Sequence, residues 1–473
     1  MRIPTPRPAS AFRKPLSAAL DHALAHLGNL DRAPVGPSTD IATLRARLNR
    51  PLADEGTASE QVIADLVADV EGGILGSAGS RFYAWVIGGS VPSAVAADWL
   101  TSAWDQNAGH HAPAPAAAVV EEVAGQWLKE ILGLPSQAGF ALVTGCQMAH
   151  VTSLAAARQG LLARRGWDVE QHGLYGAPPI RILCSELRHE TFDRALRLLG
   201  MGLVNVTYVS SDFSGRISPP ALEEALARDP SAPTIVLLQA GELNTGAYDD
   251  FEALIPIAKR HQAWVHIDGA FGLWAAASPR YRHLLKGISL ADSWATDGHK
   301  WLNVPYDCGY AFVASAESLR TAMTHEAAYL TEGDARNPLD WTPEWSRRAR
   351  AFPTYAALRE LGKNGVAGIV ERCCHCAHEL VMQIGSLPGA EVIAAPIINQ
   401  GLLRFLDPRS GATDVDHDRR TDEVIAQIVA SGEAFFGGTT CRDRRVMRVS
   451  VCNWQTSEQD VERVVKAVRK ILS

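Results

Sequence analysis

The chain has 473 residues, of which 47% are hydrophobic and 21% are charged, and its formal net charge is −7. This length allows two or three structural units, because a single hydrophobic core rarely grows beyond about 250–300 residues. The composition is typical of a soluble globular protein, and the acidic balance excludes a bulk basic surface of the kind that binds nucleic acid or anionic lipid. A small neutral or zwitterionic ligand fits this charge better.

An N-terminal helical arm is predicted over residues 1–82. Ala, Leu and charged residues recur at helical spacing over 15–72, and a run rich in Pro and Gly interrupts them at 33–38. Residues 1–20 carry four basic side chains and no acidic one, which faintly resembles a transit peptide, but their prolines and weak apolar face favour a solvated leader. No apolar run approaches the roughly 18–20 residues that a membrane span needs.

A large domain is predicted over residues 83–357, where helical and strand patterns alternate. Ala-rich amphipathic stretches are found at 114–133, 147–165 and 252–262. Short β-rich runs lie between and after them, at 180–184, 204–209, 234–239, 264–267 and 309–313. This alternation predicts an α/β fold in which helices flank a mostly parallel sheet.

A small C-terminal α+β domain is predicted over residues 358–473. The expected helices span 355–385, 419–431 and 457–471, and the expected strands lie near 401–406 and 446–452.

Two features of the large domain could bind a cofactor through a helix start. Thr144-Gly145-Cys146-Gln147 forms a glycine-containing turn ahead of a helix, where free backbone N–H groups suit a phosphate ester, although any such turn would qualify. His189 follows a strand and opens a helical segment. A histidine in this place can lie flat against an aromatic cofactor ring, or it can be a helix cap or a core residue.

Two further residues could carry covalent and acid–base chemistry. Asp268 ends a β-branched strand, where parallel sheets place functional groups, although a plain turn residue is an equally good interpretation. Lys300 lies among Trp301, Leu302 and Val304, in a segment with few other charges. A lysine in such surroundings is either a structural oddity or a nucleophile whose amine has been desolvated.

Taken in chain order, the turn, the histidine, the D-G-A strand end and the H-K-W block resemble the pyridoxal-phosphate-dependent group II decarboxylases. This is the family of aromatic-L-amino-acid decarboxylase and, more distantly, glutamate decarboxylase. The resemblance extends from about Arg81 to the C-terminal strands, and H-K-W-L-N-V-P-Y-D-C is its most specific block. It implies the fold type I of pyridoxal-phosphate-dependent transferases, pyridoxal 5'-phosphate as cofactor and a homodimer with shared active sites.

The resemblance assigns roles to the residues that match the family motifs. Lys300 matches the Schiff-base lysine and Asp268 the partner of the pyridine nitrogen. His189 matches the histidine that stacks on the cofactor ring. Ala270 matches the small residue packed beneath the ring. Together with a tyrosine described below, Lys300, His189 and Asp268 are the expected catalytic residues.

Four more residues are expected around the cofactor's phosphate and the lysine. Cys146 and Gln147 occupy the family's phosphate-contacting turn, where small or hydroxyl side chains are more usual, so the phosphate would depend on backbone N–H groups. His299 and Asp297 flank the lysine as the family's His and Asn do. Asp297 departs from that pattern, because a carboxylate would set a negative charge near the phosphate dianion.

The same resemblance indicates how a closed site would be completed. Counting on from the lysine without a gap, Tyr329 falls where the decarboxylases have the tyrosine of a mobile loop that closes over the site and protonates the α-carbon. Ser346 and Arg347 lie in a segment that resembles the loop reaching into the neighbouring subunit's site, with Ser346 as a cofactor contact. Because subunits that share sites in this way form a two-fold dimer, a homodimer is expected.

The substrate pocket is expected to have an aromatic wall. Tyr83 and Trp85 lie where the family's first pocket wall is aromatic, and Tyr306 follows the lysine and is expected to face a substrate site, its own or the partner's. The resemblance thus implies a decarboxylase that releases CO2 and an amine, from an aromatic L-amino acid ahead of an acidic one. An aldehyde synthase, a carbon–carbon lyase, an aminotransferase or a non-catalytic relative that binds the cofactor remain alternatives.

The cysteines and the remaining histidines are not expected to bind metal. Eight cysteines show no framework of disulfides, which predicts reduced thiols in a cytoplasmic protein. Cys373 and Cys376 form a CxxC with Cys374 and His378 nearby, but helical spacing would scatter these side chains around an axis. His110-His111 is interpreted either as a surface loop or as a substrate contact.

Overall fold

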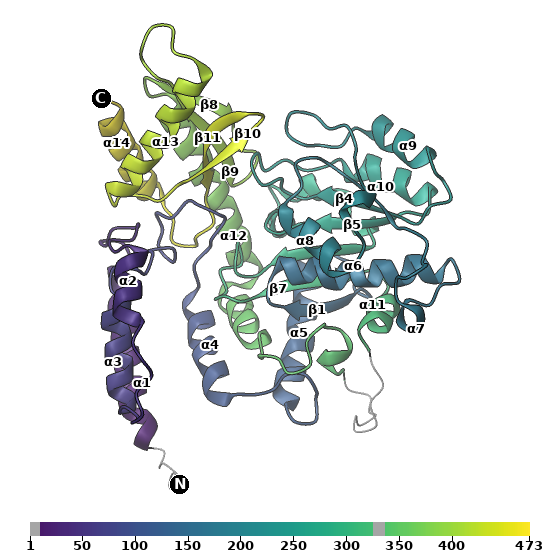
Figure 1. Cartoon of the computed structure of the whole chain (residues 1–473), viewed down its shortest axis with the longest axis horizontal. Coiled ribbons are helices and arrows are strands. Elements are labelled where there is room, and N and C mark those ends of the chain that lie inside the picture. Colours follow the sequence, from purple (N-terminus) through teal and green to yellow (C-terminus); the bar gives the residue numbers. More distant parts are fainter. Residues whose placement is uncertain (1–9, 325–335) are drawn as a thin grey trace.

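The computed structural model describes residues 10–324 and 336–473. A seven-stranded sheet forms the centre of the large unit (Figure 1). In spatial order its strands are β1 (Gly139–Val143), β7 (Gly309–Val313), β6 (Ser293–Asp297), β5 (Trp264–Asp268), β4 (Thr234–Gln239), β2 (Arg181–Cys184) and β3 (Val206–Tyr208). Strand β7 runs antiparallel to both of its neighbours, and all other adjacent strands are parallel. The predicted α/β fold with a mostly parallel sheet is confirmed, but β1 and β6 were not predicted.

Helices cover both faces of this sheet, and the strand sequences show why. Along β4, Ile235 and Leu237 pack into one hydrophobic cluster, whereas Val236 and Leu238 pack into another. Successive strand residues point to opposite faces, so a strand covered on both sides is apolar throughout. The helices of this unit are α4 (Pro92–Trp104), α5 (Pro115–Ile131), α6 (Cys146–Ala163), α7 (Val169–His172), α8 (Glu190–Leu198), α9 (Pro219–Ala227), α10 (Phe251–Arg260) and α11 (Ala316–Met323).

Short 3-10 helices connect several of these elements. They are η1 (Leu203–Asn205), η2 (Gly272–Ala277), η3 (Arg282–Leu285), η4 (Ile288–Leu290) and η5 (Pro338–Asp340). Helix α6 crosses strands β1, β5, β6 and β7 on one face of the sheet and packs against α8 and α11. The first residue of α6 follows the end of β1 closely. Because β1 runs in the same direction as β6 and β5, the start of α6 lies at the edge of the sheet where these strands have their carboxyl ends.

The C-terminal unit is an antiparallel sheet with helices on it. Its elements are α12 (Ala351–Gly385), β8 (Ala390–Ala394), β9 (Gln400–Phe405), α13 (Asp414–Ala430), β10 (Gly437–Cys441), β11 (Arg444–Ser450) and α14 (Glu458–Leu472), with strand order β10-β11-β9-β8. Capping boxes begin α13 and α14, at Thr413 and Ser457. Helix α12 is interrupted at Gly362, where φ is 58°. The boundary predicted at 357 therefore falls within α12, near this kink.

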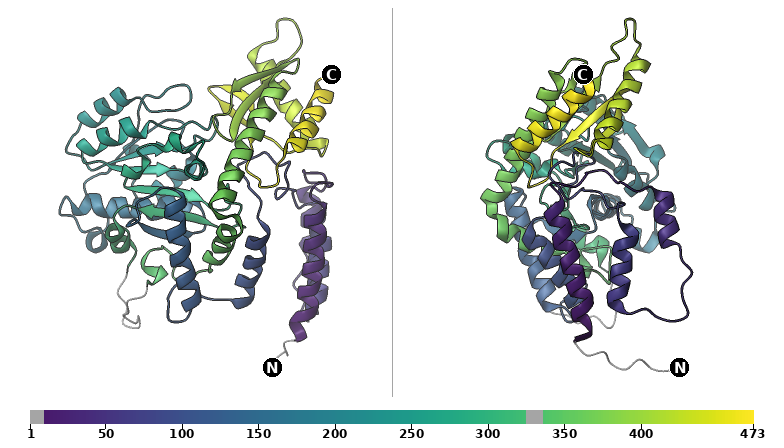
Figure 2. Two further views of the ribbon diagram at one scale, coloured as in Figure 1. Left: turned by 180° about the vertical axis from the view of Figure 1, so that it is seen from behind. Right: turned by 90° about the vertical axis from the view of Figure 1, so that its left-hand side faces the viewer.

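The N-terminal segment contains α1 (Ser10–Asn29), α2 (Ile41–Leu48) and α3 (Ser59–Val70), and α1 lies beside α3 (Figures 1 and 2). No residue of α2 or α3 is buried. Exposed apolar side chains follow one another along α1, at Phe12, Leu16, Leu20, Leu24 and Leu27. A helix with such a stripe ordinarily packs it against another surface.

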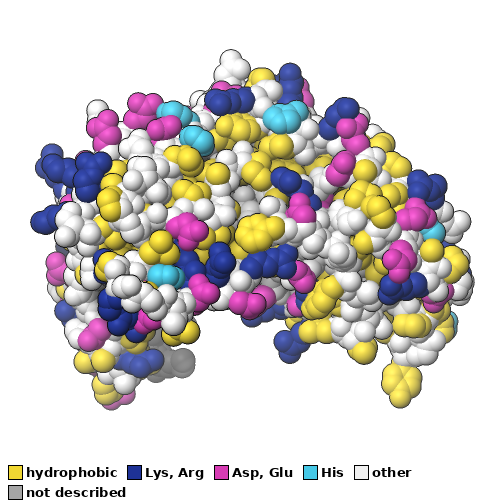
Figure 3. Space-filling model, turned by 90° about the horizontal axis from the view of Figure 1, so that it is seen from above, with side chains coloured by type: hydrophobic (Ala, Val, Ile, Leu, Met, Phe, Trp, Pro, Cys, Tyr) yellow, Lys and Arg dark blue, Asp and Glu magenta, His cyan; other side chains and the backbone are white. Residues whose placement is uncertain are grey.

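No helix among the described residues has the length and apolarity to cross a bilayer. On the face seen from above in Figure 3, basic and acidic side chains are interspersed. That face therefore has no large basic patch, in agreement with the net charge of −7.

Candidate active site

A pocket of about 440 Å³ lies at the carboxyl ends of the central parallel strands. Gln239, Asp268 and Asp297 are the last residues of β4, β5 and β6, and all three line this pocket. Adjacent parallel strands end at the same edge of a sheet, so the residues at their carboxyl ends line a shared crevice. Most of the site residues predicted from the sequence line the same pocket: Trp85, Cys146, Gln147, His189, Asp268, Ala270, Asp297, His299, Lys300 and Tyr306.

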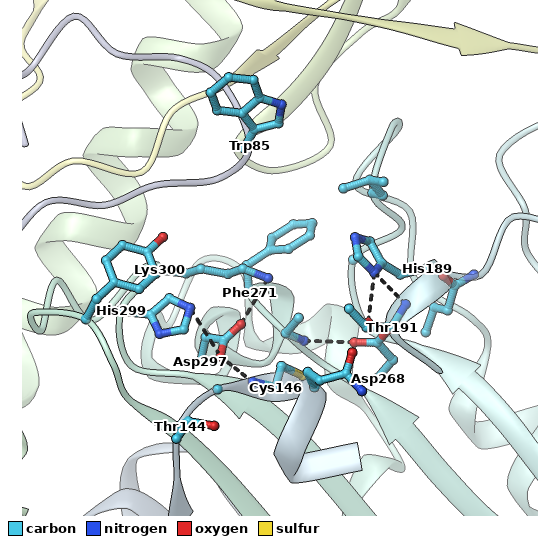
Figure 4. Close-up of a pocket in the computed structure, with 17 residues that line it drawn as sticks. Trp85, Thr144, Cys146, His189, Thr191, Asp268, Phe271, Asp297, His299 and Lys300 are labelled. Atoms are coloured by element: carbon cyan, nitrogen blue, oxygen red, sulfur yellow. Dashed lines mark hydrogen bonds and ion pairs between the residues drawn. The ribbon is translucent and has the colours of Figure 1, made fainter. Parts of the chain in front are cut away.

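At one side of the pocket, Lys300 forms an ion pair (Figure 4). Its Nζ lies 3.0 Å from Oδ2 of Asp297, a carboxylate that is almost fully buried. Burial alone would lower the pKa of Lys300, but the attraction of Asp297, with Cys146 and Asp268 nearby, raises that pKa above its ordinary value. The burial of this amine is therefore accompanied by a buried partner charge, whose attraction outweighs the desolvation.

The same carboxylate reaches the turn that was predicted to bind phosphate. The backbone N–H of Cys146, at the start of α6, donates to Oδ1 of Asp297 over 2.5 Å. A side chain on Gly309 would lie 2.4 Å from Gly145 in this turn, so only glycine lets β7 pass so close beneath it. Both polar atoms of the Gln147 side chain are buried without a hydrogen-bond partner, although Gln147 lines the pocket. The turn thus combines an anion-binding helix start with a polar side chain that has no partner of its own.

His299 lies beside the lysine and is held from two sides. Its Nδ1 accepts the backbone N–H of Cys308 over 3.2 Å, which leaves the proton on Nε2, 3.5 Å from Oδ1 of Asp297. The ring stacks on Tyr306 with 4.2 Å between ring centroids. Burial lowers the pKa of His299, so the ring is neutral near pH 7.

At the other side, His189 and Asp268 face the pocket (Figure 4). Nδ1 of His189 accepts the backbone N–H of Thr191 over 3.1 Å and so caps α8, while its ring lines the pocket. The capping and the cofactor-facing interpretations of His189 are therefore compatible. Burial lowers the pKa of His189, which keeps its ring neutral. Oδ1 of Asp268 accepts the backbone N–H of Ala270 over 3.1 Å, and only 7% of Asp268 is exposed.

The outer wall of the pocket is largely aromatic. Trp85 is 54% exposed and Tyr306 is 60% exposed, so both stand at the rim. Phe271 and Leu243 add apolar surface farther in. The wall can therefore bury a flat or apolar side chain of a bound molecule.

Three of the predicted residues are not brought to this pocket. Tyr83 is fully buried and stacks on Phe436 with 5.2 Å between centroids, so it packs in the core and does not line the pocket. Ser346 is exposed and accepts a hydrogen bond from Asn107 over 3.4 Å. Its neighbour Arg347 is buried in an ion pair with Glu121, 2.5 Å away. Tyr329 lies outside the described residues.

A family model, the pyridoxal-dependent decarboxylase conserved domain, matches residues 42–405 of the chain. The chain belongs to this family. Pyridoxal phosphate is therefore its cofactor, and the chain is a carboxy-lyase. The resemblance to the group II decarboxylases, drawn from the sequence motifs, is confirmed.

Known proteins are similar to this decarboxylase over nearly the whole length of both chains. Aromatic-L-amino-acid decarboxylase of Bacillus atrophaeus is 26% identical over 468 residues, covering 96% of this chain and 94% of that protein. The 4-hydroxyphenylacetaldehyde synthase of Rhodiola rosea is 24% identical, covering 93% of this chain and 91% of that protein. The crystal structure of Oryza sativa TDC with PLP and tryptamine is similar in fold, with a TM-score of 0.91 at 23% identity over 100% of both chains.

The residues of the decarboxylase's pocket fit pyridoxal phosphate. Besides Gln147, the amide nitrogen of Gln239 is buried without a hydrogen-bond partner, and both side chains line the pocket. Buried polar atoms cost free energy unless they are paired, so such groups are expected where a ligand completes the pairing. An amine, a helix start and a carboxylate suit the aldehyde, the phosphate and the ring nitrogen of this cofactor, respectively.

Several lining residues were not predicted from the sequence. Gln239 ends a predicted strand, so the rule that parallel strands end in functional residues could have found it. Thr191 follows His189 by two positions and Phe271 follows Asp268 by three. Only this closeness in the sequence could have indicated that they line the pocket. Leu243 lies in a loop, and no sequence pattern marks it.

The two cysteines of the CxxC sequence face backbone carbonyl groups rather than a metal site. All eight cysteines are free and buried. Sγ of Cys373 lies 3.6 Å from the carbonyl oxygen of Asn453, and Sγ of Cys376 lies 4.0 Å from that of Thr456. Within the part of the chain that the structure describes, the group close enough to hold a metal ion is instead Cys146, His150 and Asp268.

Proposed function

We propose that the chain decarboxylates an aromatic L-amino acid to CO2 and the corresponding amine. The observation that carries this proposal is that Lys300, Asp268 and His189 converge on one pocket whose outer wall is aromatic. Pyridoxal phosphate, when bound, supplies the electron sink that accepts the electron pair left behind by CO2. The protein has to bind the cofactor, hold the substrate and manage the protons.

Lys300 is the residue proposed to hold the cofactor's aldehyde carbon covalently. An ammonium group cannot do this, because its lone pair carries a proton, and the ion pair with Asp297 favours that protonated form. The ion pair with Oδ2 of Asp297, at 3.0 Å, therefore opposes this reaction until the proton leaves. The helix start at Cys146 and Gln147 would hold the phosphate through backbone N–H groups.

Asp268 and His189 are proposed to hold the ring. A carboxylate next to the pyridine nitrogen keeps a proton there, since the opposite charges stabilise each other in a buried place. The neutral ring of His189 faces the pocket from the start of α8 and is suited to stacking. Ala270, whose N–H holds Asp268, leaves room beneath the ring because its side chain is small.

Tyr329 is proposed to deliver the proton to the α-carbon after CO2 leaves. This role decides the product, because protonation of the carbon gives the amine, whereas reaction with oxygen leads to an aldehyde. It rests on the spacing from Lys300 alone. A loop that covers the site would also exclude water and oxygen.

An aromatic substrate is favoured over an acidic one by the wall of the pocket. Trp85, Phe271 and Leu243 offer apolar contact surface. Among the described residues, no arginine lines the pocket, and Lys300 is its only lysine. A second carboxylate on the substrate would thus lack a dedicated cationic partner among the described residues that line this pocket.

A cytoplasmic homodimer is part of the proposal. The exposed leucines of α1 form an apolar stripe that a second copy would cover. Ser346 is exposed outside this chain's own pocket, which agrees with a role in the partner's site. The free cysteines agree with a reducing compartment.

The test is a panel of aromatic and acidic L-amino acids assayed for CO2 release, with the products identified by mass spectrometry. We expect CO2 and amine from an aromatic substrate, and aldehyde with ammonia from Tyr329→Phe. Aldehyde as the main product of the unmodified protein would instead assign it to the aldehyde synthases. Sedimentation of the purified protein tests the dimer, and Leu20→Glu with Leu24→Glu is expected to produce monomers.

A further inference from the structure

Behind Asp268 lies a chain of polar side chains that does not line the pocket. It consists of Trp264 and His266 on β5, Ser293 on β6 and His150 on α6. His150, His266 and Ser293 have no exposed surface, and Trp264 is 3% exposed. Polar groups this deeply buried need partners, and here they are one another's partners.

The distances define a hydrogen-bonded path from Trp264 to His150. Nε1 of Trp264 lies 2.8 Å from Oγ of Ser293, which lies 2.8 Å from Nδ1 of His266. Nε2 of His266 lies 2.9 Å from Nδ1 of His150. Nε2 of His150 then lies 3.6 Å from Oδ2 of Asp268 and 3.5 Å from Sγ of Cys146.

Trp264 favours one direction for the hydrogen bonds in this path. An indole N–H can only donate, so Oγ of Ser293 accepts from it, and the serine hydroxyl donates onward to Nδ1 of His266. With Nδ1 accepting, the single proton of the neutral His266 ring is on Nε2 and is donated to Nδ1 of His150. The proton of His150 is then on Nε2, which faces the Asp268 carboxylate.

The opposite direction leaves two groups badly placed. His266 would donate from Nδ1 to Ser293, whose own hydroxyl proton would then have no partner along the path. The lone pair on Nε2 of His150 would face the carboxylate oxygen at 3.6 Å, which is repulsive, and the Cys146 thiol at 3.5 Å could offer it only a weak donor. A metal ion held by Cys146, His150 and Asp268 would likewise need that lone pair.

Both rings are neutral in these surroundings. Burial lowers the pKa of His150, with Asp268 and Asp297 opposing and His189 and Lys300 assisting. Burial lowers the pKa of His266 strongly, and His150 adds to the effect. Phe192 of α8 closes the site from the other side, packing edge-on against His150 and parallel to His266. Each neutral ring has one donor and one acceptor, as a one-directional chain requires.

We propose that Trp264, Ser293, His266 and His150 form a one-directional donor chain that ends on Asp268 and holds this carboxylate in place for the cofactor ring. His150 and His266 are thus positioning residues, which act through Asp268. One oxygen of Asp268 is held by the Ala270 N–H and the other faces His150, so the carboxylate cannot rotate freely. This inference rests on the role proposed for Asp268 under the proposed function.

Nitrogen-15 NMR of the histidine rings tests the chain directly, in the full-length protein with and without pyridoxal phosphate. Signals are assigned with His150→Gln and His266→Gln. We expect both rings to be neutral with the proton on Nε2 near pH 7. A proton on Nδ1 of either ring, or a charged ring, would overturn the proposal, whatever the enzyme does with amino acids.

The effect on the cofactor is tested with His150→Leu and His150→Gln. A leucine removes the donor, and we expect about tenfold weaker binding of pyridoxal phosphate and an altered visible spectrum of the bound cofactor. Glutamine keeps an N–H at a similar reach and should restore much of both. His378→Leu, on the exposed face of α12, serves as the control. If His150→Leu left the spectrum and the affinity for pyridoxal phosphate unchanged, the positioning role would be refuted. If both histidine rings carried the proton on Nε2 but the protein released no CO2 from amino acids, only the proposed function would be refuted.

Discussion

Nζ of Lys300 and Oδ2 of Asp297 lie 3.0 Å apart, and the other oxygen of the same carboxylate accepts the backbone N–H of Cys146. One buried side chain thus engages both the lysine amine and the first N–H of the phosphate turn. The decarboxylase has a carboxylate at the position where the family resemblance predicts an amide. A carboxylate in this position would oppose cofactor binding in two ways, because it favours the protonated form of the lysine amine and occupies the N–H group predicted to hold the phosphate.

Asp297→Asn is expected to bind pyridoxal phosphate more tightly. The amide can still accept the Cys146 N–H, but it no longer repels a phosphate dianion or holds the Lys300 proton. A lysine pKa lower by one unit means about tenfold more free amine, so association should be about tenfold faster. Stopped-flow absorbance during cofactor addition to the stripped protein measures this. Slower association or weaker affinity in Asp297→Asn would show that the carboxylate assists binding.

Lys300→Ala is expected to lose the visible absorbance of lysine-bound cofactor together with all CO2 release. No other lysine lines the pocket among the residues described, so no amine nearby can replace it. Lys286→Ala is a suitable control, because this lysine is 73% exposed and pairs with Glu252. Retention of the absorbance band in Lys300→Ala would remove this lysine from the covalent role.

Gln147→Leu should separate stability from cofactor binding. Replacing two unpaired buried polar atoms by apolar ones should raise the melting temperature of the cofactor-free protein, while the affinity for pyridoxal phosphate should fall by about threefold to tenfold. Gln159 is a matched control on the same helix, because its side-chain oxygen is also buried and unpaired but it does not line the pocket. An equal loss of affinity in Gln159→Leu would contradict a specific contact from Gln147.

Trp85→Ala should raise KM for an aromatic amino acid about tenfold with a smaller change in kcat. Losing contact with a half-exposed indole costs about 1–2 kcal/mol of binding free energy. Steady-state kinetics with aromatic and acidic substrates provide the measurement, and Tyr175→Ala, whose side chain is 99% exposed, is the control. The same proportional change for both substrate classes would argue against an aromatic preference at this wall.

Asp249 is expected to make stability depend on pH. Burial raises its pKa to about 7 from an ordinary 3.8, despite the N–H groups of Gln239 and Ile217, each at 2.7 Å. Between these values the folded state keeps a proton that the unfolded state releases. Stability should therefore fall as pH rises through this window, by up to about 1.4 kcal/mol per pH unit from this group, and level off above it.

Urea unfolding at pH 5 and pH 7 checks the contribution of Asp249. Asp249→Asn is expected to be less stable overall, because the NH2 group of the asparagine would point at a backbone N–H group that the carboxylate accepts. The urea midpoint of this variant should nevertheless change less between the two pH values. The exposed Asp54→Asn provides the control. A pH dependence as large in Asp249→Asn as in the unmodified protein would place the titrating group elsewhere.

Much of the fold could be predicted because it depends on the periodicity of apolar residues within single helices and strands. Alternating helical and strand periodicities predicted the α/β unit, and the strand over 234–239 was predicted with its observed bounds. Strand β6 was missed because Ser293–Asp297 mixes polar and apolar residues, although its neighbours bury it fully. Strand β1 was missed because its five residues stand between two helical stretches and show no alternation.

The sequence by itself determined the chemistry of this protein: a lysine in an H-K-W block, an aspartate at a strand end and a histidine at a helix start define the cofactor and the family. Only the tertiary structure decided how these groups are charged and held. Asp297 meets Cys146 across 151 positions, and His150 meets His266 across 116. Such contacts depend on the order of strands in the sheet and on the line of α6 across it. The periodicity of a single element predicts neither the strand order nor the position of α6 on the sheet, because it reflects only which face of that element is buried.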